Sequence, residues 1–191
     1  MFKSPALSMC VRLFAVVTAF VAACLVGTAG AQAGIPNPPG GNCSWNCLAN
    51  EIVFLDPSTN GTEYYADVKS VPKWAKHYNF SFDGCSVPSW VYTTLKPVGL
   101  DDNVATYSKF FKPSCKIHDF GYRNFGKGPY TVTAGDSSNA RKSVDDRFHA
   151  LMNRKCDHNP PAVPAAPDSW ACKKVADVFY QAVRKFGGSH W

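Results

Sequence analysis

The amino-acid sequence predicts a mainly α-helical domain that is stapled by disulfide bonds and carries long loops. Three observations predict it: apolar residues recur at helical spacing in the second half of the chain, evidence for β-strands is thin, and six cysteines follow an N-terminal export signal. An even number of cysteines in a small exported domain indicates a disulfide framework. Those cysteines are Cys43, Cys47, Cys85, Cys115, Cys156 and Cys172. Their spacing alone leaves the connectivity open.

The N-terminal segment has the layout of a secretory signal peptide. Lys3 and Arg12 precede an uncharged apolar run, Leu13 to Val26, and Ala29-Gly30-Ala31 supplies a small-x-small cleavage signal. The run is shorter than the roughly 18 to 20 residues that a spanning helix needs. We therefore expect residues 1–31 to be removed and the protein to be secreted and extracellular, with no transmembrane segment. Three N-glycosylation sequons agree with export; they begin at Asn42, Asn60 and Asn79.

The charge of the mature chain is weakly informative about partners. Loss of Lys3 and Arg12 lowers the formal net charge from +6 to +4, so the mature protein is mildly basic. This favours anionic surfaces such as phospholipid, cell wall or nucleic acid without choosing among them. Because the chain lacks the aromatic-basic stripe typical of single-strand binders, we expect no nucleic-acid partner.

Three segments are predicted to be helices. The first begins at Pro113, which suits a first helical turn, and runs to about Asn124, with Gly126 in the position of a C-cap glycine. The second runs from about Ser137 to Lys155 and the third begins near Trp170, each with apolar residues at helical spacing. Residues 86–112 are predicted to be a long, mostly non-periodic connection.

The first predicted helix concentrates chemically competent residues on one face. With about 100° per residue, Cys115, His118, Asp119 and Tyr122 share one arc of that helix. His118 and Asp119 lie at opposite edges of the arc, so their side chains diverge. Asp119 is therefore poorly placed to hold the imidazole of His118, and an orienting carboxylate must come from elsewhere.

The second predicted helix offers such a carboxylate. Asp145 borders the apolar face of that helix, whereas Asp146 points well away from it. A carboxylate at the edge of a helix–helix seam can fix the tautomer of His118 and stabilise the imidazolium. The alternative interpretation of Asp145 is an ordinary solvated surface acid.

An Asp-Gly-Cys turn suggests a cation site. If Cys85 pairs with Cys115, the bridge brings Asp83, Asp119 and a free carbonyl of the turn into one small volume. Oxygen-only ligands suit a hard cation, and outside the cell calcium is the expected one. A plain turn beside a structural cystine is the alternative. His118 would deprotonate a water while the cation stabilises the oxyanion of an ester; the chain has no Gly-x-Ser-x-Gly nucleophile elbow.

The run from Cys115 to Asn124, Cys-Lys-Ile-His-Asp-Phe-Gly-Tyr-Arg-Asn, resembles the active-site helix of the small secreted phospholipases A2 of bacteria and fungi. The resemblance extends over roughly residues 75 to 187. It implies that His118 is the general base, that Asp145 holds it, and that Asp119 is a calcium ligand. It also implies that Asp83 supplies a second carboxylate and Gly84 a backbone carbonyl. The disulfides that it implies are Cys85–Cys115 and Cys156–Cys172; Cys43 and Cys47 fall outside it, and we expect that they can pair with each other.

The resemblance implies a secreted, calcium-dependent phospholipase A2 that cleaves the sn-2 acyl ester of glycerophospholipids. Its fold would contain two antiparallel active-site helices, and it would act as a peripheral monomer on a membrane or micelle surface. Residues 75–191 would form the catalytic domain and residues 32–74 an N-terminal extension whose role the sequence leaves open. The alternative is a non-catalytic effector or toxin-type binding protein on the same scaffold.

The substrate contacts are the least determined part of the sequence. Phe110 and Phe111 could dip into a lipid surface, but core packing of one of them is the favoured interpretation. A further hypothesis is that an acyl-chain channel is lined by Trp90, Tyr92 and Leu95. The stretch between Cys85 and Cys115 is longer than is usual for the family, which predicts a reshaped entrance to the site.

Overall fold

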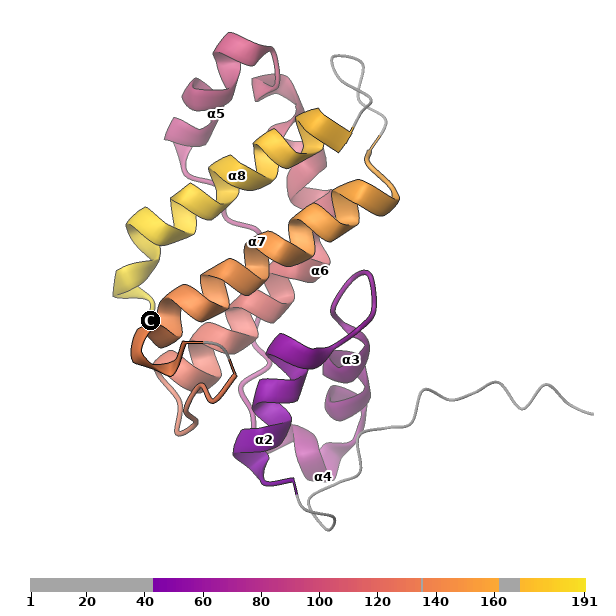
Figure 1. The fold of residues 1–191 in the computed structure, drawn as a ribbon, viewed down its shortest axis with the longest axis vertical. Coiled ribbons are helices and arrows are strands. Elements are labelled where there is room, and N and C mark those ends of the chain that lie inside the picture. Colours follow the sequence, from indigo (N-terminus) through magenta and orange to yellow (C-terminus); the bar gives the residue numbers. More distant parts are fainter. Residues whose placement is uncertain (1–42, 135, 162–168) are drawn as a thin grey trace, which may run out of the picture. The chain divides into compact units, whose positions relative to one another are not determined.

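The computed structural model describes residues 43–134, 136–161 and 169–191, and every regular element within these ranges is helical (Figure 1). The predicted signal peptide and the sequon at Asn42 lie outside the described residues. The helical elements are α2 (Trp45–Asn50), η1 (Glu51–Leu55), α3 (Glu63–Ser70), α4 (Pro72–Ala75), α5 (Ser89–Leu95), η2 (Lys96–Val98), η3 (Asp101–Asn103), α6 (Val104–Gly121), η4 (Tyr122–Gly126), η5 (Ser137–Asn139), α7 (Ala140–His158), α8 (Ser169–Phe186) and η6 (Gly187–Ser189). Of the η elements, η1 and η4 are π-helices and the others are 3-10 helices.

Three long helices form the frame of the domain. α7 packs against both α6 and α8 (Figure 1). His118 of α6 contacts Asp145 of α7, while Phe110, two turns earlier in α6, lies under the ammonium group of Lys155, later in α7. The two helices therefore run antiparallel, as predicted.

The predicted start of the first helix at Pro113 was wrong. α6 begins at Val104, and Pro113 lies inside it. Val104, Tyr107 and Phe111 follow helical spacing and are fully buried. Burial of this apolar stripe outweighs the single backbone hydrogen bond that a proline cannot donate. The prediction that residues 86–112 are non-periodic was wrong for the same reason, since α5 and the first half of α6 lie there.

The second and third predicted helices are confirmed. α7 follows a 3-10 turn that begins at Ser137 and is capped by the Asp136 carboxylate, which accepts from the amide of Ser138 at 3.0 Å. It continues to His158, three residues past the predicted end. α8 begins at Ser169, one residue before the predicted Trp170.

The segment from residue 43 to residue 78, most of which the sequence left without a role, packs against the central helices. Leu48, Ile52 and Val68 are buried in a core that also contains Ile117 of α6 and Leu151 of α7. Ala49, Val53, Tyr65, Trp74 and Tyr78 join the same core. These contacts pack residues 43–78 against α6 and α7.

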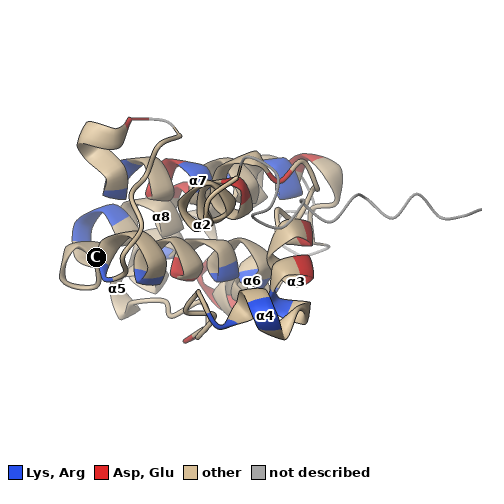
Figure 2. Cartoon of the chain, turned by 90° about the horizontal axis from the view of Figure 1, so that it is seen from below, with Lys and Arg blue, Asp and Glu red and all other residues tan. Residues whose placement is uncertain are grey.

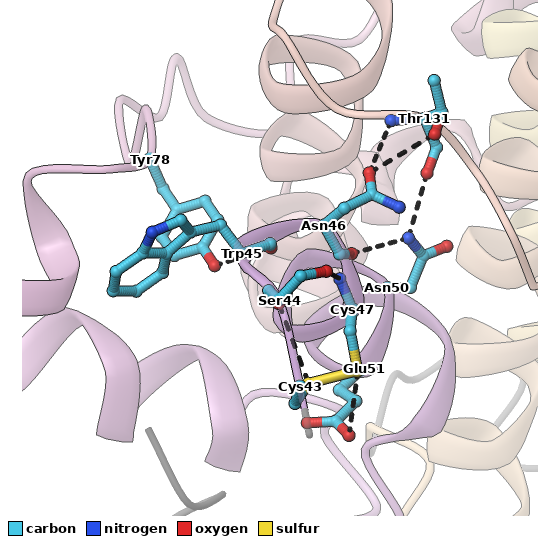
Figure 3. The surroundings of a disulfide bond; sticks show 9 residues. All are labelled: Cys43, Ser44, Trp45, Asn46, Cys47, Asn50, Glu51, Tyr78 and Thr131. Carbon is cyan, nitrogen blue, oxygen red and sulfur yellow. Dashed lines mark hydrogen bonds between the residues drawn. A yellow bond between two sulfur atoms is a disulfide. The ribbon is translucent and has the colours of Figure 1, made fainter. Parts of the chain in front are cut away.

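Hydrogen bonds fix α2 to the loop that follows α6. The amide side chain of Asn46 accepts from the backbone N–H of Thr131 at 2.7 Å, and that of Asn50 donates to the Thr131 carbonyl at 3.0 Å (Figure 3). The hydroxyl of Tyr78 donates to the carbonyl of Trp45 at 2.8 Å. The disulfide between Cys43 and Cys47 closes the start of this helix (Figure 3).

Two further disulfides join elements that meet at the core. Cys85–Cys115 attaches the loop before α5 to the middle of α6, and Cys156–Cys172 joins the end of α7 to the start of α8. Both are the pairs that the resemblance implied.

Charged residues are interspersed over the helices. Figure 2 shows basic segments in blue and acidic segments in red alternating along the chain, with a basic concentration at α4. In the part of the chain that the structure describes, no helix has both the length and the apolar character needed to cross a bilayer.

Candidate active site

A buried histidine–aspartate pair lies at the seam between α6 and α7. Nε2 of His118 is 2.8 Å from Oδ1 of Asp145, and Asp145 is fully buried. The structure thus brings together the two residues that the helical-wheel geometry selected. Asp146 faces away from this seam, as expected, and its carboxylate binds Lys142 and the hydroxyl of Tyr180.

Two residues that were given no role in the sequence analysis donate hydrogen bonds to Asp145, and the guanidinium of Arg141 lies 3.7 Å from its Oδ2. The hydroxyl of Tyr122 donates to Oδ1 at 2.7 Å, and Nη1 of Arg184 donates to Oδ2 at 2.7 Å. Arg184 comes from α8, so three helices converge on one carboxylate. Tyr122 was already on the chemically competent face of its helix, whereas no periodic signal marks Arg184.

These contacts keep Asp145 ionised. Burial alone would raise its pKa, but the hydrogen bonds from His118, Tyr122 and Arg184 outweigh burial and hold the pKa below the ordinary value of 3.8. Ionised Asp145 accepts a hydrogen bond from the Nε2–H group of His118, which selects the tautomer with a free Nδ1. His118 also lines a cavity, so its imidazole ring can be reached from the solvent side of the site.

The structure also brings the two predicted metal-binding carboxylates together. The backbone N–H of Asp83 donates to Oδ2 of Asp119 at 3.2 Å. Gly84 has φ +90°, a left-handed conformation that suits glycine, and it turns the chain toward the anchoring Cys85–Cys115 disulfide. Burial raises the pKa of Asp119, partly offset by the N–H of Asp83 and by the guanidinium of Arg123.

Arg123 is a site residue that the sequence analysis did not identify. Its Nη2 bonds Oδ2 of Asp83, and its Nη1 lies 3.5 Å from Oδ2 of Asp119. The guanidinium of Arg123 thus bridges the two carboxylates. Carboxylate oxygens are ligands that hard cations prefer, so Asp83 and Asp119 are the residues here that could hold such an ion.

A second cluster of metal-type donors is not a metal site. Among the described residues, Cys43, Cys47 and Glu51 place their donor atoms close together. Both sulfurs are consumed in the Cys43–Cys47 disulfide, so they cannot act as thiolate ligands.

A cavity of about 520 Å³ connects the polar groups to an apolar wall. His118, Asp119 and Asp83 line the polar part. The apolar part comes from α5, α7 and α8 and includes Val91, Phe148, Phe179, Ala182, Val183 and Phe186. This size lies within the range of about 300 to 1,000 Å³ typical of ligand pockets.

Trp90, Tyr92 and Leu95, to which the sequence analysis assigned an acyl-chain channel, are not among the residues that line this cavity. Successive residues of a helix point in different directions, so Leu95 enters the core while Tyr92 is 43% exposed. The core interpretation of Phe111 is confirmed by its complete burial.

The comparisons with known proteins agree with this site. A family model described as prokaryotic phospholipase A2 matches residues 53–187. A secretory phospholipase A2 of Arthroderma benhamiae is 34% identical over 112 residues, covering 57% of this chain and 60% of that protein. Another from Beauveria bassiana is 37% identical over 78 residues, covering 41% of this chain and 35% of that protein.

The chain thus spans about 60% or less of the length of these relatives, and no solved structure matches. The family match begins at residue 53 and therefore includes the end of η1 and all of α3 and α4, whose buried residues share a core with α6 and α7. It covers more than half of the chain and contains the His118–Asp145 pair. The chain belongs to the prokaryotic phospholipase A2 family.

Proposed function

We propose that this protein is a secreted, calcium-dependent phospholipase A2 that hydrolyses the sn-2 acyl ester of glycerophospholipids. The observation that carries the proposal is the buried His118–Asp145 pair, which opens on an apolar cavity beside the carboxylates of Asp83 and Asp119. Family membership and the name secretory phospholipase A2, which both relatives bear, support the reaction class and export.

In this mechanism His118 acts as the general base. Nε2 is held by Asp145, so Nδ1 accepts a proton from a water molecule, whose oxygen attacks the ester carbonyl. Ionised Asp145 stabilises the imidazolium that forms, and Arg184 and Tyr122 keep Asp145 in place. The imidazolium then returns its proton to the departing glycerol oxygen, which leaves a fatty acid and a lysophospholipid.

The residues present fit the calcium ion that the family implies. Asp83, Asp119 and the carbonyl of Gly84 would hold it, because two adjacent carboxylates and a turn carbonyl form an oxygen-only donor set. When bound, calcium would polarise the ester carbonyl and stabilise the negative charge of the oxyanion.

The apolar wall of the cavity supports a lipid substrate. An acyl chain would lie along Val91, Phe179 and Val183, with its ester near His118. Phe186 lines the same cavity and is 45% exposed, as expected for a rim that contacts a membrane or micelle surface. We propose peripheral binding by a monomer, with residues 75–191 carrying all the catalytic groups and residues 43–74 bracing them.

The test is positional release of fatty acid from phosphatidylcholine vesicles that carry different acyl chains at sn-1 and sn-2. The oxidised protein should release the sn-2 chain with calcium and should be inactive with excess chelator. His118→Ala should lower the rate by about 10² to 10⁴.

His149→Ala is the matched control, because His149 also pairs with an aspartate, Asp177, at 2.8 Å but is not among the residues that line the cavity. It should retain activity. A folded, calcium-binding but inactive protein would favour the non-catalytic effector instead, and chelator-resistant hydrolysis would exclude the calcium mechanism.

A further inference from the structure

The guanidinium of Arg123 occupies the space between the two carboxylates of the proposed calcium site. It bonds Oδ2 of Asp83 and approaches Oδ2 of Asp119 at 3.5 Å. Its Nη1 also donates to the backbone carbonyl of Asp119 at 3.3 Å. The side chains of Arg123 and Asp119 are about equally shielded, 18% and 20% exposed, whereas that of Asp83 is 78% exposed.

Calcium at this site and the guanidinium of Arg123 would draw on the same two carboxylates. Calcium binds six to eight oxygens at about 2.3 to 2.6 Å, which needs lone pairs of Asp83 and Asp119 to point at the ion. The guanidinium uses Oδ2 of both carboxylates. A divalent ion and an arginine charge within a few ångströms also repel one another. The arginine-bound and calcium-bound arrangements therefore exclude each other at these atoms.

We propose that Arg123 is a tethered competitor cation, which holds the Asp83–Asp119 pair together in the calcium-free protein and is displaced when calcium binds. The inference rests on the proposed calcium site and adds to it a residue that sets its affinity. Arg123 can leave because its long side chain is anchored only by hydrogen bonds, and Asp83 can reorient because it is largely exposed. The competitor keeps the turn at Asp83 ordered before calcium arrives, at the expense of calcium affinity.

Competition predicts opposite effects on calcium affinity and on calcium-free stability. If only the fraction of molecules with Arg123 released can bind calcium, the apparent dissociation constant rises by the inverse of that fraction. For an ion pair that is exposed to half-buried, Arg123 would be released in roughly 10 to 30% of the molecules. Arg123→Gln should therefore bind calcium about 3- to 10-fold more tightly than the wild type. The same variant should melt at a lower temperature in chelator, because the two carboxylates then repel.

The experiment is calorimetric titration of Ca²⁺ into the oxidised full chain, with thermal melts in chelator and in calcium. Lys116→Gln is the matched control: it removes one positive charge from α6, from an ammonium that lies 5.9 Å from the ring of Phe82, next to Asp83. Its calcium affinity should stay within about twofold of the wild type, since a charge that bonds neither carboxylate acts on the site only through screened electrostatics. Arg123→Lys keeps the charge without the planar fork and should lie between the wild type and Arg123→Gln.

Several results would overturn the proposal. Weaker or unchanged calcium binding by a folded Arg123→Gln, with calcium-dependent wild-type hydrolysis intact, would make Arg123 a support of Asp119 and leave the proposed function standing. An equal gain in calcium affinity in Lys116→Gln would show that the effect comes from net charge alone. If the wild type and Arg123→Gln both fail to bind calcium, or Asp119→Asn binds it normally, the calcium site itself is wrong and the competitor falls with it. Should Arg123→Gln misfold, Arg123→Lys carries the test through its own predicted gain.

Discussion

Gly121 and Val144 set the distance between the two helices that carry the candidate active site. A β-carbon built on Gly121 would lie 2.6 Å from Cγ1 of Val144, closer than such atoms approach in proteins. Gly121 is three residues after His118, and Val144 is adjacent to Asp145. The absent side chain therefore lets α6 approach α7 closely enough for the 2.8 Å contact between His118 and Asp145.

The first prediction is that Gly121→Ala pushes the two helices apart. Overpacking at such a contact costs about 1 to 3 kcal/mol of folding stability. We expect a lower melting temperature and a 10-fold or greater loss of activity, since the His118–Asp145 hydrogen bond lengthens. Gly188→Ala is the control, because a β-carbon there meets nothing within 4 Å. Equal behaviour of the two variants would show that the Gly121 contact does not determine the geometry.

The second prediction concerns the hydroxyl of Tyr122. Tyr122→Phe removes its hydrogen bond to Asp145 while keeping the ring, so we expect a loss of about 1 kcal/mol in stability and a reduced turnover number. Tyr180→Phe removes a similar bond to Asp146, outside the site, and should lower stability without changing turnover. Steady-state hydrolysis and urea unfolding of both variants check this. Equal turnover in the two would leave Tyr122 with a packing role only.

The third prediction is a pH dependence of stability that originates in Asp145. The folded pKa of Asp145 is lowered, so its stabilising effect is complete above the ordinary pKa of 3.8 and is lost as the pH falls through the folded value. Asp145→Asn should therefore destabilise the protein by roughly 2 to 3 kcal/mol at pH 7 and by progressively less below pH 4. Urea unfolding of the wild type and Asp145→Asn, at pH 7 and below pH 4, measures this destabilisation. If the destabilisation is the same at both pH values, the ionisation of Asp145 is not its cause.

Asp146→Asn is the matched control for that measurement. Asp146 is adjacent in sequence and its pKa is also lowered, because its hydrogen bonds from Lys142 and Tyr180 outweigh the opposing effect of burial. Its side chain is 45% exposed, so its ion pair contributes little. The destabilisation at pH 7 should stay below about 1 kcal/mol.

The sequence predicted those parts of the structure that depend on local periodicity. The 100° step of a helix placed His118, Asp119 and Tyr122 on one face, and the apolar stripe of the next helix selected Asp145 over Asp146. Periodicity also located α7 and α8. It failed at Pro113 because a local breaker was weighed more heavily than the burial of Tyr107 and Phe111, which only the tertiary structure supplies.

Contacts between distant segments leave no comparable pattern in the sequence. Arg184 reaches Asp145 across 39 residues, and Arg123 reaches Asp83 across 40, through long side chains that any surface arginine also has. The cavity wall combines residues of α5, α7 and α8, so its composition depends on how those helices pack. This is why Trp90, Tyr92 and Leu95, chosen from residue type alone, are not among the residues that line it.

The fourth prediction ranks the disulfides. Replacing Cys85 and Cys115 by serine opens a loop with a sequence separation of 30, against 4 for Cys43 and Cys47. The chain-entropy model gives roughly 3 to 4 kcal/mol for the longer loop and about 2 kcal/mol for the shorter. Loss of Cys85–Cys115 should also weaken calcium binding, because Asp83 is two residues away, while loss of Cys43–Cys47 should not. Urea unfolding measures the loss of stability, and calcium titration measures the loss of affinity. If both disulfide variants bind calcium equally well, Cys85–Cys115 does not hold the calcium site.

The fifth prediction tests the apolar wall as the acyl-chain site. Val183 lines the cavity and is partly buried, so Val183→Trp should fill the space beside His118 without disturbing the His118–Asp145 pair. We expect hydrolysis of long-chain phosphatidylcholine to fall at least 10-fold and that of short-chain esters much less. Tyr92→Ala truncates a larger side chain that is 43% exposed and outside the cavity lining, and it should hydrolyse both substrates normally. If Val183→Trp lowers both rates equally, the wall supports the catalytic groups rather than the acyl chain. If instead Tyr92→Ala is selectively defective on long chains, the acyl chain lies along the exposed face of α5 that carries Tyr92 and not in this cavity.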